Sequence, residues 1–404
     1  MNDEIYLRKK CTCCAHENFD EVLNLGFHPL ADTFVKKENP TINNVFVPLI
    51  VMHCKNCNHF FTKYFISPQR RYSHNEYSYE TGNSRVAVQH FQEFSWEIIK
   101  NLSLCKTSKI IDIGGNDGTF LKQFYDSGFT NLLNVEPSEN IARLSESKNS
   151  VSAINIFYGE SIYEHIIKSS VDLIITANVL NHFDNVQEFF KISEKLLKDG
   201  GHLVCEVPDV SELIARNAFD TIYHEHVNYF SVNALSKVGM ENGLTMIRWD
   251  KSDYMCGSVR VYFAKNQDLK AKQTLPVPLQ SDSFIELSKK MKSIKMKLLK
   301  LVCDLKNEGK AVFCIGAATK GNTLLNYVGL DNDLIDFICD HTELKVGKIA
   351  PGSMIPIIHD RQIPNNSKNA IILPSNLAEF LKPKFEHLGL RFIEPLKGEF
   401  LNED

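Results

Sequence analysis

Apolar positions in the middle of the chain follow two periods in turn. Over residues 84–101 they recur at helical spacing, whereas four later segments are short apolar runs of strand length. The predicted strands cover residues 109–113, 132–135, 171–177 and 202–207, and a further helix is predicted over 186–197. Strands that alternate with helices form parallel sheets covered on both faces, so this region is expected to be a doubly wound α/β sheet.

The pattern changes after Pro208. An irregular stretch is followed by a predicted helix over 234–242 and by two strands, 244–249 and 258–264. No helix separates these two strands, and parallel neighbours need a long crossover connection. We therefore expect the last strand to run antiparallel to its neighbour.

A linker marked by Pro276 and Pro278 leads into a long amphipathic stretch. Its apolar residues keep spacings of three and four over 284–305, with lysines mostly on the opposite face. This pattern predicts a surface helix joining two domains, with a dimerising coil as the alternative. A second α/β unit is then predicted from strands at 311–315, 334–339, 370–373 and 390–393 and from helices that start at Gly321 and cover 377–388.

The first 70 residues have a different texture. Short apolar pieces such as 45–52 lie between turn residues, which is typical of a small β-rich module. The expected organisation is an N-terminal module over residues 1–75, a central α/β domain over 76–270 and a C-terminal Rossmann-like α/β domain over 271–404.

Composition limits the choice of partners and compartment. The 45 basic and 49 acidic residues leave a formal charge of -4, which offers no field to attract nucleic acid or an anionic membrane. The polar start lacks the apolar segment of a signal peptide, and no apolar run is long enough to span a membrane. We expect a cytoplasmic protein. In that reducing compartment, paired cysteines are better interpreted as metal ligands than as disulfides.

Two Cys-x-x-Cys pairs stand out among the eleven cysteines: Cys11 with Cys14, and Cys54 with Cys57. Two such pairs supply the four thiolates of a closed tetrahedral zinc site, which leaves no open position for chemistry. The expected role of the metal is to stabilise a module too small to fold alone. Redox activity or chance spacing is the alternative. Cys13, His53 and His59 lie nearby but are not needed as ligands.

A glycine turn follows the predicted strand at 109–113. The run 110–118 places an acidic residue before the turn, and its ligand-binding candidates are Asp112, Gly114, Gly115, Asp117 and Gly118. This resembles the acidic-x-Gly-x-x-x-Gly turn of methyltransferases more than the Gly-x-Gly-x-x-Gly turn of dinucleotide enzymes. Asp117 at the helix start is tolerable beside a sulfonium cofactor, which carries no phosphate.

Polar residues follow the next strands as well. Glu136 ends the second strand, followed by Pro137, and a carboxylate there can accept hydrogen bonds from both ribose hydroxyls of a methyl donor or of NAD. Asn178 follows the third strand. Together with the glycine turn, these residues favour S-adenosylmethionine as the cofactor.

The segment after the strand at 202–207 contains Tyr223, His224, Glu225 and His226. It follows the carboxyl end of a sheet strand, where open α/β folds bind ligands, and His182 follows the preceding strand at the same edge. The spacing does not match His-Glu-x-x-His, so a second metal site is disfavoured. Acid–base chemistry is the main hypothesis, and a structural role is the alternative.

In the C-terminal unit, a turn over 316–323 precedes a helix and carries Lys320. Backbone amides at a helix start, together with a lysine, suit a diphosphate. The alternative is a turn that only joins a strand to a helix.

The whole chain resembles the nucleotide-sugar C-methyltransferases of deoxysugar pathways. The features that carry the resemblance are the paired cysteines, Tyr77 and Tyr79, the turn at 112–118, the segments 178–182, 223–226 and 229–231, and the C-terminal residues 316–323, 325–326, Asp340, Lys345, Gly347 and 351–352. Asn228 departs from the pattern, since a serine is expected there. We expect this difference to affect packing more than chemistry.

The resemblance implies a reaction and roles for the residues. A ketone-bearing deoxysugar linked to a nucleoside diphosphate would be deprotonated beside the ketone and methylated, at C3 if the ketone is at C4. His226 would be the base, Glu225 its orienting partner, Tyr223 the enolate partner and His182 a second donor at the ketone. Substrate contacts are expected from Tyr77, Tyr79, His224, Lys320 and Asn322.

Two other functions remain open on sequence grounds. An O-methyltransferase for a sugar or another metabolite would share the cofactor site but needs a hydroxyl in place of a ketone. An RNA methyltransferase with a zinc module would need a basic face around the cysteines, where only a few cations cluster. The expected partner is therefore the nucleotide sugar, without nucleic acid or membrane, and the expected state is a monomer or weak dimer.

Overall fold

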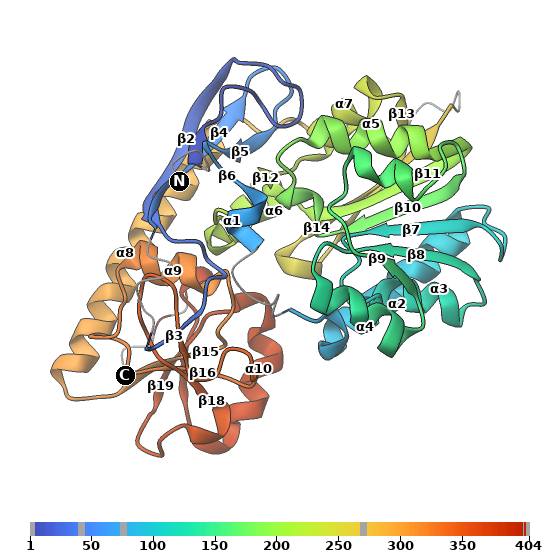
Figure 1. The fold of residues 1–404 in the computed structure, drawn as a ribbon. Coiled ribbons are helices and arrows are strands. Elements are labelled where there is room, and N and C mark those ends of the chain that lie inside the picture. Colours follow the sequence, from blue (N-terminus) through green and yellow to red (C-terminus); the bar gives the residue numbers. More distant parts are fainter. Residues whose placement is uncertain (1–4, 39–44, 73–78, 267–272, 399, 401–404) are drawn as a thin grey trace.

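The computed structural model describes residues 5–38, 45–72, 79–266, 273–398 and 400. Figure 1 shows three regions, with the N-terminal strands above the start of the long helix α8, the largest sheet beside them and the C-terminal sheet below. Within the described residues, no helix is long and apolar enough to cross a membrane.

The central region is a seven-stranded sheet in the order β13-β14-β11-β10-β7-β8-β9. The five strands from β11 to β9 are mutually parallel, and β14 pairs antiparallel with both of its neighbours, as predicted from the missing crossover. The strands are β7 Lys109–Ile113, β8 Asn131–Val135, β9 Ser152–Ile154, β10 Val171–Ala177, β11 Leu197–Pro208, β13 Leu244–Ser252 and β14 Ser258–Lys265.

Helices cover both faces of this sheet. Apolar residues of α2 and α3 pack with one set of strand residues, and those of α5 and α7 pack with the alternate set. This arrangement follows from the period of two in a strand, which sends neighbouring side chains to opposite faces. The helices are α2 Arg85–Asn101, α3 Thr119–Asp126, α4 Glu139–Asn149, α5 Val186–Leu196, α6 Val210–Ala215 and α7 Val232–Glu241.

The N-terminal region forms a small antiparallel sheet in the order β12-β5-β4-β2. Its fourth strand, β12 (Asn228–Tyr229), comes from the central region and pairs with Phe60 and Phe61 of β5. The remaining elements are β1 Ile5–Leu7, β2 Phe19–His28, β3 Val35–Lys36, β4 Val47–Cys54, β5 Phe60–Thr62, β6 Tyr64–Ile66 and α1 Pro68–Tyr72. The N-terminal sheet is therefore completed by a strand that directly follows the candidate catalytic residues 223–226.

The C-terminal region is a five-stranded parallel sheet in the order β18-β16-β15-β19-β20. Helix α8 (Asp282–Asn307) precedes it, as predicted. Strand β16 is shorter than expected because the turn from Asp331 takes up Leu334 and Ile335. The other elements are β15 Val312–Ile315, α9 Gly321–Val328, β17 Lys348–Ile349, β18 Ile357–His359, β19 Asn369–Ile372, α10 Ala378–Phe385 and β20 Arg391–Ile393.

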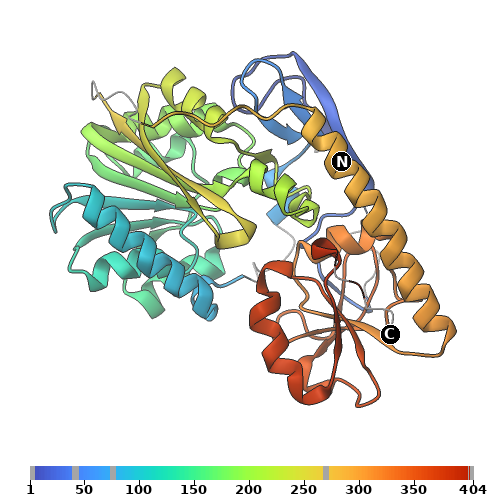
Figure 2. The same cartoon turned by 180° about the vertical axis from the view of Figure 1, so that it is seen from behind.

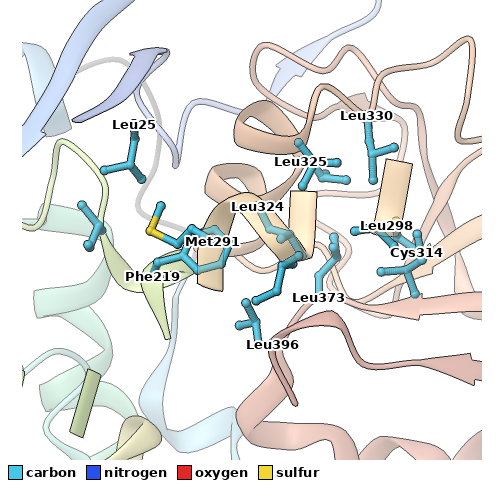
Figure 3. Close-up of a cluster of buried hydrophobic side chains, with 14 of the residues drawn as sticks. Leu25, Phe219, Met291, Leu298, Cys314, Leu324, Leu325, Leu330, Leu373 and Leu396 are labelled. Atoms are coloured by element: carbon cyan, nitrogen blue, oxygen red, sulfur yellow. The ribbon is translucent and has the colours of Figure 1, made fainter. Parts of the chain in front are cut away.

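One hydrophobic core joins the three regions. Seven buried residues of α8, from Phe284 to Leu305, pack with the N-terminal sheet, the segment before β12 and the C-terminal sheet. Figure 3 shows Leu25 of β2, Phe219 of the segment before β12 and Met291 of α8 lying together. Strand β3 also pairs with β17 of the C-terminal region, and Figure 2 shows α8 running beside both end regions. The N-terminal segment is thus built into the rest of the protein.

Candidate active site

The four predicted cysteines meet at one point. Their Sγ atoms all lie within 4.8 Å of one another, with 3.6 Å between Cys11 and Cys57 and 3.5 Å between Cys14 and Cys54. A tetrahedral zinc ion with Zn–S bonds of about 2.3 Å separates its sulfurs by about 3.8 Å. The cluster therefore fits a zinc ion held by four thiolates.

The neighbouring residues stay outside this cluster. His53 contacts Ser281 and Asn58 at 3.0 Å each, and His59 contacts Asn228 at 3.0 Å. Cys13 is fully buried, and burial together with the charge of Cys14 raises the pKa of its thiol. A complete sulfur set leaves no position for water, so the zinc is structural.

The turn at 114–118 lies at the end of β7. A Cβ atom added to Gly115 would come within 2.5 Å of Asn134 Oδ1 and 2.7 Å of Asp112 Oδ2, so only glycine fits there. Asp117 accepts hydrogen bonds from Thr119 N at 3.2 Å and Gly82 N at 2.8 Å. The predicted cofactor residue Asp117 thus caps α3 and fixes the preceding segment, while Gly118 is the first residue before that helix.

Two buried carboxyl groups flank the turn. Glu136 accepts hydrogen bonds from Asn116 N at 3.1 Å and Ser138 N at 2.8 Å, which hold its carboxylate at the end of β8 beside the partly exposed Pro137. Burial raises the pKa of Glu136, and burial with the nearby Glu136 charge raises the pKa of Asp112 further. Hydrogen-bond donors supplied by a ribose would stabilise the charged form of Glu136.

Asn178 follows β10 at the same edge of the sheet. Its backbone conformation is left-handed (φ 59°), and its backbone N–H donates to Glu206 O at 2.8 Å. Its Oδ1 atom is buried and has no hydrogen-bond partner among the described residues. A buried acceptor without a donor is costly, so this atom is consistent with a donor group supplied by a bound cofactor.

Tyr223 and His226 form a close pair. A hydrogen bond of 3.0 Å from His226 N to Tyr223 O closes a turn, which brings the two side chains together and directs the intervening two elsewhere. The Tyr223 hydroxyl lies 2.5 Å from His226 Nε2, and His226 Nδ1 lies 2.9 Å from Thr221 O. Because a carbonyl only accepts, Nδ1 carries the proton and Nε2 accepts from the tyrosine.

The surroundings keep His226 neutral. Burial lowers the pKa of His226 well below its ordinary value, and the nearby His182 and Lys320 lower it further. The His182 and His226 ring centroids are 4.9 Å apart, so the structure brings together two histidines 44 positions apart in the chain. A neutral imidazole can accept a proton at Nε2 once the tyrosine hydroxyl no longer donates to that atom.

His182 has the same polarity as His226. Its Nδ1 lies 2.8 Å from Glu225 O and therefore donates, and burial and Arg71 lower its pKa to about 4. The neutral ring presents Nε2 as an acceptor. The role of His182 as a second donor at the ketone stays a prediction, and with Nδ1 donating to Glu225 O it requires the protonated ring.

Glu225 does not orient His226 through its carboxylate; the Thr221 carbonyl does so. The Glu225 carboxylate accepts from Ala31 N at 3.2 Å and Asp32 N at 3.0 Å. Burial raises the pKa of Glu225 to about 7. The carboxyl group therefore fixes the N-terminal loop against the catalytic segment.

The turn also directs His224 away from Tyr223 and His226. The His224 ring is 3% exposed and its Nε2 lies 3.1 Å from Val47 O and 3.2 Å from His28 O. In place of the expected substrate contact, the structure gives His224 a structural role.

The C-terminal turn at 316–323 faces the same segment. Asn322 donates to Ala31 O at 2.7 Å and is 2% exposed, so its amide joins regions and is not directed at a substrate. Lys320 Nζ lies 3.4 Å from Cys256 Sγ and 3.6 Å from the buried carboxylate of Asp220. Tyr79 is 41% exposed, and Tyr77 lies outside the described residues.

Sequence reasoning missed three contributors. Thr221 acts through its backbone carbonyl, which no side-chain pattern reveals. Arg71 donates to His182 O at 3.0 Å from far away in the chain. Asp220 is fully buried beside Lys320, and only its place three residues before Tyr223 could have drawn attention to it.

Comparison with known proteins agrees with this architecture. Three family models match in order: "Putative zinc binding domain" over residues 11–72, "Methyltransferase domain" over 88–248 and "C-methyltransferase C-terminal domain" over 255–396. The chain is similar to C-methyltransferase NovU of Streptomyces niveus, with 27% identity over 412 residues that cover 98% of this chain and 97% of the relative.

Solved structures of methyltransferases overlap the central region. A SAM-dependent methyltransferase from Archaeoglobus fulgidus is 14% identical, with a TM-score of 0.37, over 44% of this chain and 94% of its own. Geranyl diphosphate C-methyltransferase from Streptomyces coelicolor is 12% identical, with a TM-score of 0.36, over 44% of this chain and 79% of its own. In order along the chain, the matches are to a zinc-binding domain, a methyltransferase domain and a C-methyltransferase C-terminal domain. With the full-length relative, they indicate an S-adenosylmethionine-dependent C-methyltransferase.

Proposed function

We propose that the protein methylates the carbon beside the ketone of a nucleoside-diphosphate-linked 4-keto-deoxysugar, at C3. The observation that carries this proposal is the Tyr223–His226 pair, in which a neutral imidazole presents Nε2 toward a tyrosine hydroxyl at 2.5 Å. Formation of a carbon–carbon bond requires a carbanion, and a carbon beside a ketone is acidic enough to provide one. A base that removes the α proton and a hydroxyl that donates to the enolate oxygen are the two groups which this chemistry needs.

The pair divides the work between base and enolate partner. His226 Nε2 takes the proton from the α carbon, and Thr221 O stabilises the imidazolium through Nδ1–H. The Tyr223 hydroxyl, no longer needed by Nε2, donates to the enolate oxygen. Bound S-adenosylmethionine would supply an electrophilic methyl group, whose transfer to the carbanion would break the methyl–sulfur bond and leave its electron pair on sulfur.

Residues at the strand ends hold the methyl donor in this proposal. Glu136 accepts from the ribose hydroxyls, Asn178 Oδ1 accepts from a donor of the cofactor, and Asp112 supports the turn that brings Gly115 close. Lys320, which lies near His226, is the C-terminal residue placed best for the sugar nucleotide. Tyr79 is proposed to contact the same substrate.

A substrate panel tests the proposal. Thymidine-, guanosine- and cytidine-diphosphate 4-keto sugars are incubated with the protein and S-adenosylmethionine labelled with carbon-13 at the methyl group. A gain of one methyl identifies the substrate, and a carbon NMR signal of a methyl bound to carbon is expected. A methyl signal typical of an oxygen-bound carbon would instead show an O-methyltransferase and would contradict the proposal.

A further inference from the structure

The N-terminal module holds the backbone around His182 from several sides. Val186 N donates to Thr12 O at 3.0 Å, and Thr12 lies between the zinc-binding cysteines Cys11 and Cys14. Arg71 donates to His182 O at 3.0 Å. Arg8 and Arg71 both form ion pairs with Asp184. The turn that carries His182 is therefore bound to the zinc module through both backbone and charge.

Asn228 lies at the centre of this contact. Its Oδ1 accepts from Thr12 Oγ1 at 2.6 Å and from His59 Nε2 at 3.0 Å, on the side of the zinc module. Its Nδ2 donates to Phe183 O at 2.6 Å and Leu180 O at 3.3 Å, on the side of His182. The residue is 2% exposed, so water cannot replace a lost partner, and the loss of any of these hydrogen bonds leaves a buried polar group unpaired.

Only one orientation of this amide satisfies its neighbours. Turning the side chain over would place Oδ1 against two carbonyl oxygens, where no hydrogen bond can form. A side chain that accepts on one side and donates on the other is therefore required. An ionised aspartate of the same shape could accept hydrogen bonds but could not donate to Phe183 O. A hydrophobic side chain could neither accept nor donate.

We propose that Asn228 is a positioning residue that transmits the geometry of the zinc module to His182. This inference rests on the proposed function, because the His182 ring lies next to the proposed base His226, with ring centroids 4.9 Å apart. The Asn228 amide fixes the backbone carbonyls of Leu180 and Phe183 on both sides of His182. The orientation of the His182 ring is fixed by the hydrogen bond of 2.8 Å from its Nδ1 to Glu225 O. The zinc ion thus supports catalysis through a hydrogen-bond path while touching no reactant.

The first test is Asn228→Asp in the full-length zinc-loaded protein, with exchange of the sugar α proton measured in deuterated water. Misplacing a group of the site lowers the rate by roughly 10- to 100-fold, and we expect a loss in this range. The loss relative to wild type should shrink as pH falls, because a protonated carboxyl can again donate to Phe183 O. Zinc content and binding of S-adenosylhomocysteine should stay within about twofold.

Asn369→Asp is the matched control. Asn369 is 3% exposed and donates to Ala311 O at 3.0 Å, but it lies in the C-terminal sheet. It should leave the exchange rate unchanged at every pH. If Asn228→Asp does not fold, Thr12→Val removes only the bond to Asn228 Oδ1 and should give a smaller loss with intact zinc.

Two results would overturn the inference: an Asn228→Asp protein with wild-type exchange, or a loss that is the same at every pH. If the wild-type protein exchanges no proton with any sugar, the proposed function fails on its own. The histidine NMR spectrum of nitrogen-15-labelled protein then decides, since Asn228→Asp should shift the His182 ring signals. An unshifted His182 signal would contradict the positioning role without reference to any substrate.

Discussion

The chain has two glycine-containing turns at equivalent places, one after β7 and one after β15, and their surroundings differ. Around the turn at 114–118, Glu136 and the unpartnered Asn178 Oδ1 remain as groups for a ligand. Around the turn at 316–323, side chains bond within the protein: Thr319 to Asp32 at 2.7 Å, Asn322 to Ala31 and Thr323 to Ile222 at 2.9 Å. The first turn is the proposed cofactor site, and the second docks the C-terminal sheet onto the N-terminal loop and the segment before Tyr223.

The difference shows how the same strand–turn–helix unit serves two purposes. The two carboxylates are held alike: Glu136 accepts from Asn116 N and Ser138 N, and Asp340, the last residue of β16, accepts from Ala317 N at 2.6 Å and Thr342 N at 2.8 Å. The difference lies in the other side chains around each turn. At the second turn, Lys345 donates to Ala317 O at 2.9 Å, and Thr319, Asn322 and Thr323 bond to other parts of the protein.

The largest contrast is expected from paired glycine substitutions. In Gly115→Ala the new Cβ meets Asn134 and Asp112, and in Gly321→Ala it comes within 2.7 Å of Leu373 Cβ. Overpacking of this kind costs up to about 3 kcal/mol. Gly115→Ala should weaken binding of S-adenosylhomocysteine by calorimetry, whereas Gly321→Ala should lower the free energy of unfolding and leave that affinity unchanged. The reverse pattern would contradict the assignment of the two turns.

The two acidic residues sharpen the comparison. Glu136→Ala removes an acceptor of the ribose hydroxyls and should weaken cofactor binding by about 2 kcal/mol, since bonds to a charged acceptor are lost. Asp340→Ala, its counterpart at the end of β16, should leave this affinity unchanged. Equal affinities in titration calorimetry of Glu136→Ala and wild type would show that the ribose does not lie there.

A smaller effect is expected at the contact between Thr323 of α9 and Ile222 before the catalytic residues. Thr323→Val keeps the shape of a side chain that is 1% exposed but removes its bond to Ile222 O. The loss of one neutral hydrogen bond should cost about 1 kcal/mol of unfolding free energy. Urea titration measures it, and an unchanged midpoint would mean that the contact does not stabilise the docked state.

The smallest expected effect is on the pH dependence of α-proton exchange. The groups around His226 are His182, Lys320, the Tyr223 hydroxyl and the Thr221 carbonyl, and the pKa of His226 is lowered. Exchange should therefore persist below pH 6.5 and fall only as the ring gains a proton in more acidic solution. Lys320→Met removes a cation and should move this acid limb upward. If the acid limb of Lys320→Met moved to lower pH, the positive charge of Lys320 would not be what lowers the pKa of His226.

Much of the fold could be predicted from sequence because local periodicity determines it. The strands 109–113 and 171–177 were predicted with the bounds of β7 and β10, and the zinc cysteines follow from spacing alone. The joining of the regions could not be predicted, because β12 and α8 bury residues against segments far away in the chain.

The division of roles within residues 223–226 was less accessible still. A backbone hydrogen bond from His226 N to Tyr223 O decides which side chains meet, and a sequence pattern does not contain that bond. It separates Tyr223 and His226 from the buried His224 and Glu225. Motif reasoning therefore found the segment but assigned the orienting role to a carboxylate in place of the Thr221 carbonyl.

The most direct measurement of the proposed chemistry is α-proton exchange in the absence of the methyl donor. Wild-type protein should exchange the proton beside the ketone with deuterated water, and His226→Asn should lower that rate by about 10²- to 10⁴-fold, as expected for loss of a general base. Binding of S-adenosylhomocysteine and of the sugar nucleotide should stay near normal. A variant that exchanges as fast as wild type but transfers no methyl would show that His226 is not the base.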